Sequence, residues 1–451
     1  MTRASVLIAG AGPAGSALAL QLSRVGHAVS LVAPARKTHR PPETLPGTVG
    51  EHLDALGLNL ELQSLPRIAT PSIEVAWGDD HAVELPARSL HVDRDAFDAL
   101  LLDAARRAGA SITRAGVVRV ERAGTWRIHL DNGKSARADL LVDATGRAAR
   151  VAHALGARRI DFDRLVALVF SAARQRDHDT LLVESTWDGW WYSSPAPGAD
   201  AALVHLTDLD LLKHAARSRH RIETLTPPPN LRARVSDARF QRALRASTYL
   251  VEPLAGDGWL AVGDAAFALD PLSGQGVIEA LCSARAAARA IFDQNLPAYE
   301  TTQRRRFDAQ LRARAQTYAA ERRFAASRFW RRRHGIDPWR VPITLDPETQ
   351  LQSNPTAPHH HFTQRHPYDD LENLLPAREL RRLSALCTPG RRAHQVIAAY
   401  QAVSPCRIVD RRVIVALESL VTRGALSVVA PTASTSELEP IASTSNVEPT
   451  T

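Results

Sequence analysis

The sequence contains few cysteines, few lysines and no long apolar run. Its three cysteines, Cys282, Cys387 and Cys406, lack the spacing of a metal or redox motif, and an odd number argues against a disulfide framework. The histidines at 359–361 are interpreted as polar surface, so no metal site is predicted. No apolar run reaches the roughly 18 residues of a membrane span, and glycines interrupt the apolar N-terminus where a signal peptide needs its hydrophobic region. These features predict a soluble cytoplasmic protein.

Positive charge is abundant and is carried almost entirely by arginine. The chain has a formal net charge of +8, and only Lys37, Lys134 and Lys213 among its 56 basic residues are lysines. The basic residues are scattered through the chain and do not form one tract interleaved with aromatic residues, so nucleic-acid binding is not expected. A solvated basic surface explains the charge most simply, although the same surface would also suit an acidic partner protein.

Residues 5–32 carry the clearest motif. A short apolar strand is followed by Gly10, Gly12 and Gly15 at GxGxxG spacing, then by a helical pattern ending at Gly26 and a second strand. Glycines at this spacing allow a tight turn, close approach of the backbone to a pyrophosphate, and packing of the helix on the strand. Free N–H groups at the helix N-terminus favour the negative charge of a diphosphate. The stretch therefore predicts a Rossmann-like dinucleotide-binding unit.

One feature departs from this pattern. The acidic residue that normally follows the second strand and binds the ribose is absent, because residues 33–36 read APAR. The ribose would then be bound by the backbone or by Arg36. An arginine here would also suit the 2′-phosphate of NADP. FAD is favoured over NADP because of two further motifs downstream.

These two motifs are later strands that each end in a turn. One strand ends in the sequence ATG at residues 144–146, and another, from 259 to 262, ends before Asp264. Ligands bind at the carboxyl edge of such sheets, so Asp264 is a candidate ligand-binding residue rather than only a helix cap. Residues 274–276 open a long helix, and their backbone N–H groups could stabilise negative charge on a ring system.

The remaining patterns divide the chain into segments of an α/β protein. We expect a first part of the FAD-binding domain at 1–160, including a β-rich insertion near 66–92, followed by an antiparallel substrate-domain sheet at 161–255. The FAD-binding domain would return at 256–334 and finish in one long arginine-rich helix over 299–334, whose charges form a solvated face. After a linker at 335–370, residues 371–430 predict a small helical module, either winged-helix-like or a plain helical cap, and 431–451 a disordered tail.

The sequences GAGPAGSA, ATG and GDAAFALDPLSGQG together resemble the FAD-dependent monooxygenase superfamily. This superfamily includes aromatic hydroxylases of the para-hydroxybenzoate hydroxylase type, flavin-dependent tryptophan halogenases and geranylgeranyl reductases, and the resemblance covers about residues 3–330. It implies that FAD is the cofactor. It further implies that Arg94 contacts the phosphate–ribityl region and Asp264 the ribityl chain. The pyrophosphate of FAD would contact Gly10, Gly12, Ala14 and Gly15. The pyrimidine edge of the flavin would contact Pro271, Gly274, Gln275 and Gly276.

Two shorter stretches point to a branch of this superfamily. PETLP at 42–46 is similar to a loop of the halogenase and reductase branch, and GWWYSSPAP at 189–197 is similar to the halogenase tryptophan motif. Halogenases place a lysine between flavin and substrate some tens of residues after that loop, but no lysine lies between Lys37 and Lys134. The resemblance therefore favours the flavoprotein maturases that hydroxylate a peptidyl tryptophan when tryptophylquinone cofactors of amine dehydrogenases or oxidases are made.

The function expected from this resemblance is hydroxylation of an electron-rich aromatic substrate, either a small molecule or a polypeptide. Trp190, Trp191 and Tyr192 are candidates for the pocket wall or for ordinary strand core. Glu43 and His91 are the candidates for a general base. No second GxGxxG is present, so NAD(P)H would bind transiently or a separate reductase would supply reduced flavin. The alternatives are a polyprenyl reductase, a tryptophan halogenase, and a non-catalytic flavoprotein maturation factor that binds a partner protein through the C-terminal module.

Overall fold

The chain is described by a computed structural model. The described residues are 4–35, 40–175, 178–197, 200–215, 222, 225–335, 345–354, 375, 377–403, 410–423 and 425–429. Arg36, the histidines at 359–361 and the C-terminal tail at 431–451 lie outside these ranges, so the predictions made for them have no structural counterpart here. Within the described residues, no helix combines the length and the apolar character that a membrane span requires.

The N-terminal motif lies in a six-stranded, mainly parallel sheet. The strand order is β18 (Ala255–Gly256), β19 (Trp259–Ala261), β10 (Leu140–Asp143), β1 (Ser5–Ala9), β2 (Ala28–Ala33) and β6 (Ser111–Arg114). Val6, Leu7 and Ile8 of β1 are all buried, as expected for a strand with both faces covered. One face packs against helices α1 (Pro13–Arg24), α4 (Arg94–Arg107) and α9 (Gly276–Phe292). The other face packs against the meander β7 (Val117–Ala123), β8 (Thr125–Leu130) and β9 (Ser135–Ala138).

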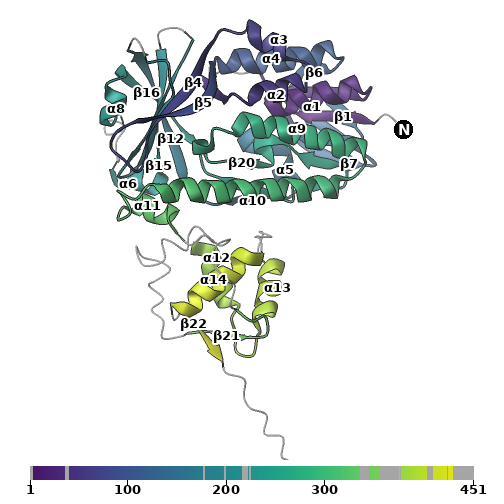
Figure 1. Cartoon of the computed structure of the whole chain (residues 1–451). Coiled ribbons are helices and arrows are strands. Elements are labelled where there is room, and N and C mark those ends of the chain that lie inside the picture. The colour runs from purple at the N-terminus through teal and green to yellow at the C-terminus, as the bar shows by residue number, and fades with distance from the viewer. Residues whose placement is uncertain are drawn as a thin grey trace, which may run out of the picture.

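A second sheet of eight strands lies beside the first (Figure 1). Its order is β16 (Val235–Arg245), β12 (Leu165–Arg174), β15 (Asp200–Asp208), β14 (Gly189–Pro195), β13 (Leu182–Thr186), β4 (Arg67–Ala76), β5 (Val83–Val92) and β3 (Glu43–Pro46). All neighbours are antiparallel except β13 and β4. The strands expected as an insertion near 66–92 therefore belong to the same sheet as those of 161–255. The predicted fold class, a Rossmann-like sheet with a largely antiparallel second sheet, is confirmed.

Shorter elements connect these layers. They are α2 (Val49–Asp54), α3 (Asn59–Ser64), α5 (Arg150–Ala154), α6 (Leu209–Ala215), α8 (Pro229–Arg232) and the 3₁₀ turns η1 (Gly146–Ala148), η2 (Gly263–Ala265) and η3 (Pro271–Ser273). A small sheet is formed by β11 (Arg158–Asp161), β17 (Tyr249–Glu252) and β20 (Phe267–Ala268).

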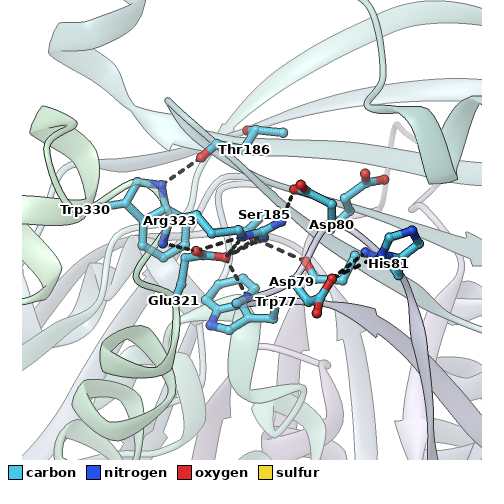
Figure 2. A network of polar contacts seen from close by, with 12 residues as sticks. Trp77, Asp79, Asp80, His81, Ser185, Thr186, Glu321, Arg323 and Trp330 are labelled. Carbon is cyan, nitrogen blue, oxygen red and sulfur yellow. Dashed lines mark hydrogen bonds and ion pairs between the residues drawn. The ribbon is translucent and has the colours of Figure 1, made fainter.

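The prediction of one helix over 299–334 is wrong. Helix α10 (Leu296–Ala320) runs from the first sheet to the second and ends there, and α11 (Arg328–Arg333) follows after a turn (Figure 1). The backbone of Glu321 is extended, and its buried carboxylate accepts hydrogen bonds from the N–H of Gly78 (2.7 Å) and the hydroxyl of Ser185 (2.5 Å). Burial alone would raise the pKa of Glu321, but these donors and Arg323 lower it to about 2. These contacts with the second sheet override the local helical preference (Figure 2).

The arginines of this region are also less exposed than a solvated face requires. Arg332 and Arg333 are buried and contact Asp208 at the end of β15, with N–O distances of 2.8 Å. Arg314 pairs with Asp270 and Asp163 at 2.9 Å each. The expectation that the charges form a solvated face is therefore wrong for these three residues.

The C-terminal part contains α12 (Ala377–Ala385), α13 (Ala393–Val403) and α14 (Asp410–Thr422). Strand β22 (Leu426–Val429) pairs with β21 (Gln350–Ser353), which lies in the segment expected as a linker. These elements share a hydrophobic cluster that includes Ile160 of β11, and the guanidinium of Arg412 lies 4.6 Å from the ring centre of Phe162. The winged-helix-like character of this part stays a prediction.

Candidate cofactor and substrate site

The first glycine turn packs tightly against the strand beside it. Gly10 has φ +121°, and a Cβ added there would lie 2.0 Å from the carbonyl oxygen of Ala144, just after β10. A Cβ at Gly15 would lie 2.0 Å from the carbonyl oxygen of Gly10. Gly12 differs, because no atom lies within 4 Å of the Cβ position. Gly10 and Gly15 thus serve close packing, whereas Gly12 leaves open space at the N-terminus of α1.

The second turn, at the ATG sequence, is fixed by Asp143. The buried carboxylate accepts hydrogen bonds from the N–H of Thr145 (2.9 Å), the hydroxyl of Thr145 (2.6 Å) and the N–H of Ala152 (2.8 Å). Burial raises the pKa of Asp143 despite these donors. Because Ala144 contacts Gly10, this rigid turn forms one side of the first glycine turn.

The third turn, η2, contacts the first from the other side. A Cβ at Gly263, where φ is +58°, would lie 2.8 Å from the Cβ of Ala14. The neighbouring carboxylate of Asp264 is 41% exposed, and its Oδ2 lies 3.6 Å from Nε of Arg147, the residue after the ATG turn. The hydroxyl of Tyr249 donates to the carbonyl oxygen of Asp264 at 2.5 Å. Asp264 therefore presents its carboxylate at the carboxyl edge of the parallel sheet.

The loop between η2 and α9 is shaped by Asp270. Its carboxylate accepts a hydrogen bond from the N–H of Leu272 (3.0 Å), and its carbonyl oxygen accepts one from the N–H of Ser273 (3.0 Å). Gly274 follows with φ +60°, and no atom lies within 4 Å of a Cβ built at Gly274 or at Gly276. The loop that begins at Pro271 is thus defined in shape and open beside its glycines.

These observations fit an extended dinucleotide. The structure brings the three predicted glycine turns together, with open space at Gly12, Gly274 and Gly276. The N-cap of α1 is Gly12, which has no side chain to bind the free N–H groups of the first helical turn, so those groups are available to a diphosphate. The individual contacts of Gly10, Gly12, Ala14, Gly15, Asp264, Pro271, Gly274, Gln275 and Gly276 with FAD stay predictions.

Arg94 begins α4, and two carboxylates surround its guanidinium. Its Nη1 donates to Glu43 Oε2 at 2.5 Å and its Nε to Asp98 Oδ1 at 2.8 Å. Burial acts against the charge of Arg94, but the two carboxylates outweigh it and raise its pKa. Glu43 is therefore engaged in an ion pair, which makes it a poor general base. The predicted contact of Arg94 with FAD stays a prediction.

His91 lies in a cluster of hydroxyl groups on the second sheet. Its Nδ1 is 2.9 Å from Oγ1 of Thr44 and 3.4 Å from Oγ of Ser194, and its Nε2 is 3.5 Å from Oγ1 of Thr70. The imidazole is completely buried, and its burial lowers the pKa to about 4, with Arg174 acting in the same direction. The ring is therefore neutral at pH 7. A neutral imidazole among hydroxyls can exchange a proton with them, so the structure keeps His91 as a candidate and favours it over Glu43.

We expect the His91→Gln variant to lose stability less steeply on acidification than the parent. In the unfolded chain His91 takes up a proton near pH 6.5, whereas in the folded chain it does so near pH 4. The stability that neutral His91 contributes is thus fully present above pH 6.5. About 3 kcal/mol of the free energy of unfolding is lost as the pH falls from 6.5 to 4. Urea unfolding of both proteins between pH 4 and 7 measures the difference. If the stability of both proteins fell equally with pH, His91 would take up its proton at the same pH in the folded and unfolded chains.

The three aromatic residues of β14 do not share one wall. Alternation along the strand places Trp190 and Tyr192 on the face toward α10, where Trp190 Nε1 donates to the hydroxyl of Tyr318 (3.0 Å). Trp191 lies on the opposite face, stacked on His205 with ring centres 4.3 Å apart. Trp191 therefore belongs to the strand core, the second of the two roles expected for these residues.

The sequence analysis did not identify several residues that shape this site. Thr44 and Ser194 contact each other at 2.6 Å although their strands are four places apart in the sheet. Tyr318 comes from α10 and reaches the same face. Thr44 and Ser194 lie in the PETLP and GWWYSSPAP stretches, but no local pattern shows that they meet, and none marks Tyr318. Arg147 is different, because it directly follows the ATG turn, and this position in the sequence indicates a residue close to the site.

Fold and site together define a class. The chain has the fold of the FAD-dependent halogenases and monooxygenases. The family model described as lycopene cyclase protein matches residues 5–172, which contain the first two glycine turns. LodB of Marinomonas mediterranea, named as an FAD-dependent oxidoreductase, is 28% identical over 266 residues, which cover 54% of this chain and 71% of LodB.

Two solved structures cover almost the whole chain. The peptidyl tryptophan dihydroxylase QhpG, described as essential for tryptophylquinone cofactor biogenesis, matches with a TM-score of 0.60 and 24% identity over 94% of this chain and 100% of QhpG. The flavin-dependent halogenase CmlS matches with a TM-score of 0.66 and 20% identity over 95% of this chain and 96% of CmlS. Other curated relatives include a tryptophan 2-halogenase and a digeranylgeranylglycerophospholipid reductase. The homologues are thus FAD-dependent oxidoreductases, monooxygenases and halogenases.

Proposed function

We propose that the protein is an FAD-dependent monooxygenase that hydroxylates an electron-rich aromatic ring, specifically the indole of a tryptophan within a polypeptide. The observation that carries the proposal is the position of the loop that begins at Pro271. This loop continues from the three glycine turns, and its Leu272 packs against the aromatic cluster of Trp190 on the second sheet. A flavin ring at this loop would therefore be near the face of the second sheet that carries Trp190 and Tyr192.

Bound FAD supplies the activation of dioxygen, and the protein supplies orientation, exclusion of water and charge stabilisation. The N–H of Gly276 at the start of α9 would stabilise negative charge at the ring edge, whereas the N–H groups of Gly274 and Gln275 already donate hydrogen bonds within the loop. Trp190 is buried against Trp77 and would support the substrate site from behind. Tyr192 on the same face is only partly buried and would contact an aromatic substrate. Burial raises the pKa of Tyr192, with the Glu43 carboxylate acting in the same direction, so its phenol stays protonated. His91 would move a proton through the hydroxyl of Thr44 or Ser194, both within 3.5 Å of its Nδ1.

Hydroxylation is favoured over halogenation by the place of Lys134. This residue lies in the turn between β8 and β9, strands that cover the first sheet, and it is exposed there. It cannot deliver an activated halogen to the face that carries Trp190. The similarity of QhpG along the whole chain supports a polypeptide substrate. NAD(P)H or reduced flavin would supply the electrons.

The test is mass spectrometry of candidate polypeptides and small indoles after incubation with the protein, FAD, NADH and oxygen. We expect a gain of about 16 or 32 mass units on a tryptophan, dependent on oxygen. A parallel reaction with added bromide would reveal a halogenase through a halogen mass increment. Oxygen-independent NADH oxidation stimulated by a polyprenyl lipid would indicate a reductase. A purified chain that does not bind FAD would contradict the proposal.

A further inference from the structure

A chain of buried hydrogen bonds joins the second sheet to the loop of Asp270. Nε1 of Trp190 donates to the hydroxyl of Tyr318 at 3.0 Å, and that hydroxyl donates to Asp270 Oδ2 at 3.0 Å. All three side chains are buried. Burial raises the pKa of Tyr318, and the Asp270 carboxylate acts in the same direction, so the phenol keeps the proton that it donates.

The carboxylate of Asp270 connects this chain to the loop itself. Its Oδ1 accepts the hydrogen bond from the N–H of Leu272, and its carbonyl oxygen accepts bonds from the N–H and the hydroxyl of Ser273. The hydroxyl of Ser273 in turn accepts a bond from the N–H of Gln275 (3.2 Å). The position of Asp270 therefore determines where the backbone from Leu272 to Gln275 lies.

Arg314 contacts the same carboxylate oxygen of Asp270 as Tyr318 does. It lies one helical turn before Tyr318 on α10, so both side chains lie on the same face of the helix. Its guanidinium contacts Asp270 Oδ2 and Asp163 Oδ2 at 2.9 Å each, and Asp163 accepts hydrogen bonds from the N–H groups of Leu165 (3.0 Å) and Thr248. The charge of Asp270 is thus neutralised by Arg314, which leaves Tyr318 as the link to Trp190.

We infer that Tyr318 is a positioning residue, which couples the buried aromatic cluster around Trp190 on the second sheet to the loop that would hold the pyrimidine edge of the flavin. This inference rests on the proposed function. Hydrogen bonds to a charged acceptor are stronger than those between neutral groups, so the bond from Tyr318 to Asp270 can bias the geometry of a short loop. A shift of the Trp190 indole would therefore be transmitted through Tyr318 and Asp270 to the backbone between Leu272 and Gln275.

The test compares Tyr318→Phe with Tyr299→Phe. Tyr299 is a matched control, because it is a buried tyrosine of the same helix whose hydroxyl donates to the carbonyl oxygen of Ala261 (2.6 Å), away from the loop. Hydrogen exchange of the cofactor-free proteins should be about tenfold faster over residues 271–276 in the Tyr318 variant and unchanged there in the control. In the FAD-loaded proteins, the Tyr318 variant should bind reduced flavin about three- to tenfold more weakly relative to oxidised flavin, a more negative potential by up to about 30 mV.

Trp190→Phe is a second variant, which removes only the hydrogen bond between Trp190 and Tyr318. We expect it to change the exchange rates and the potential in the same direction but by less. It also decides the matter if the Tyr318 variant does not fold. The inference would be overturned if the Tyr318 variant kept the exchange rates and the potential of the wild type, or if the Tyr299 control changed equally. Neither result would affect the proposed function. Failure of the wild-type chain to bind FAD would overturn the proposed function and the potential shift, while the exchange measurement would still report on the positioning of the loop.

Discussion

Gly10→Ala is expected to leave a chain that folds poorly and does not retain FAD. The new methyl group would lie 2.0 Å from the carbonyl oxygen of Ala144, and both residues directly follow buried strands, β1 and β10, which are paired and cannot move apart. The φ of +121° at Gly10 is also disfavoured for alanine. The clash and the backbone strain together should lower the free energy of unfolding by about 3 kcal/mol or more. Urea unfolding of the cofactor-free proteins measures this change.

Gly12→Ala is the matched control for Gly10→Ala. Gly12 has φ −82°, which alanine adopts readily, and no atom lies within 4 Å of the added Cβ. The free energy of unfolding should change by less than about 1 kcal/mol, as expected for a substitution without a clash. The methyl group would nevertheless occupy the space that we assign to the pyrophosphate, so affinity for FAD should fall at least about tenfold, by about 1.4 kcal/mol. Unchanged affinity would show that the pyrophosphate does not approach Gly12.

Asp208→Ala should be the most destabilising change in the second sheet. The carboxylate of Asp208 is 2% exposed and binds Arg332 and Arg333, whose side chains are also buried. Removing it takes the paired carboxylate from buried Arg333, while Arg332 keeps its pair with Asp210. Losses of about 3–5 kcal/mol are typical when one partner of a buried ion pair is removed. Thermal and urea unfolding measure the loss. Glu348→Ala is the control, because its pair with Arg392 is about half exposed and should contribute at most about 1 kcal/mol.

The effect of Asp208→Ala should depend on pH. Burial alone would raise the pKa of Asp208, but Arg333 and Arg332 outweigh burial and lower it. A carboxyl with a lowered folded-state pKa stabilises the protein fully above its unfolded pKa of about 3.9, and this contribution is lost as the pH falls further. The difference between parent and variant should therefore shrink below about pH 4. A difference that stays constant down to pH 2 would contradict the assignment of the stabilisation to this ion pair.

Buried and exposed arginines have the same appearance in the sequence. The run from 328 to 333 was expected as a solvated face, yet Arg332 and Arg333 are buried because Asp208 and Asp210 lie opposite them. Helix α10 likewise ends at Ala320 for a reason that no local pattern shows. The carboxylate of Glu321 binds Gly78 and Ser185, residues that are far away in the sequence. Contacts of this kind depend on how the folded chain brings distant residues together.

The sequence by itself determined the Rossmann-like unit and the three glycine turns. These features depend on local rules, namely apolar runs for buried strands, glycines where a side chain would collide, and a helix that begins directly after a turn. Gly10 and Gly15 have close neighbours within the turns that the sequence predicted.

Only the tertiary structure decided which side chains of the second sheet, α10 and the loop of Asp270 contact one another. It separated Trp190 from Trp191, placed His91 beside Thr44 and Ser194, and brought Tyr318 to Asp270. The physical reason is that these contacts join residues from different strands and helices. Their distances depend on how the second sheet curves and on where α10 crosses it, and neither is encoded in the local sequence around any one residue.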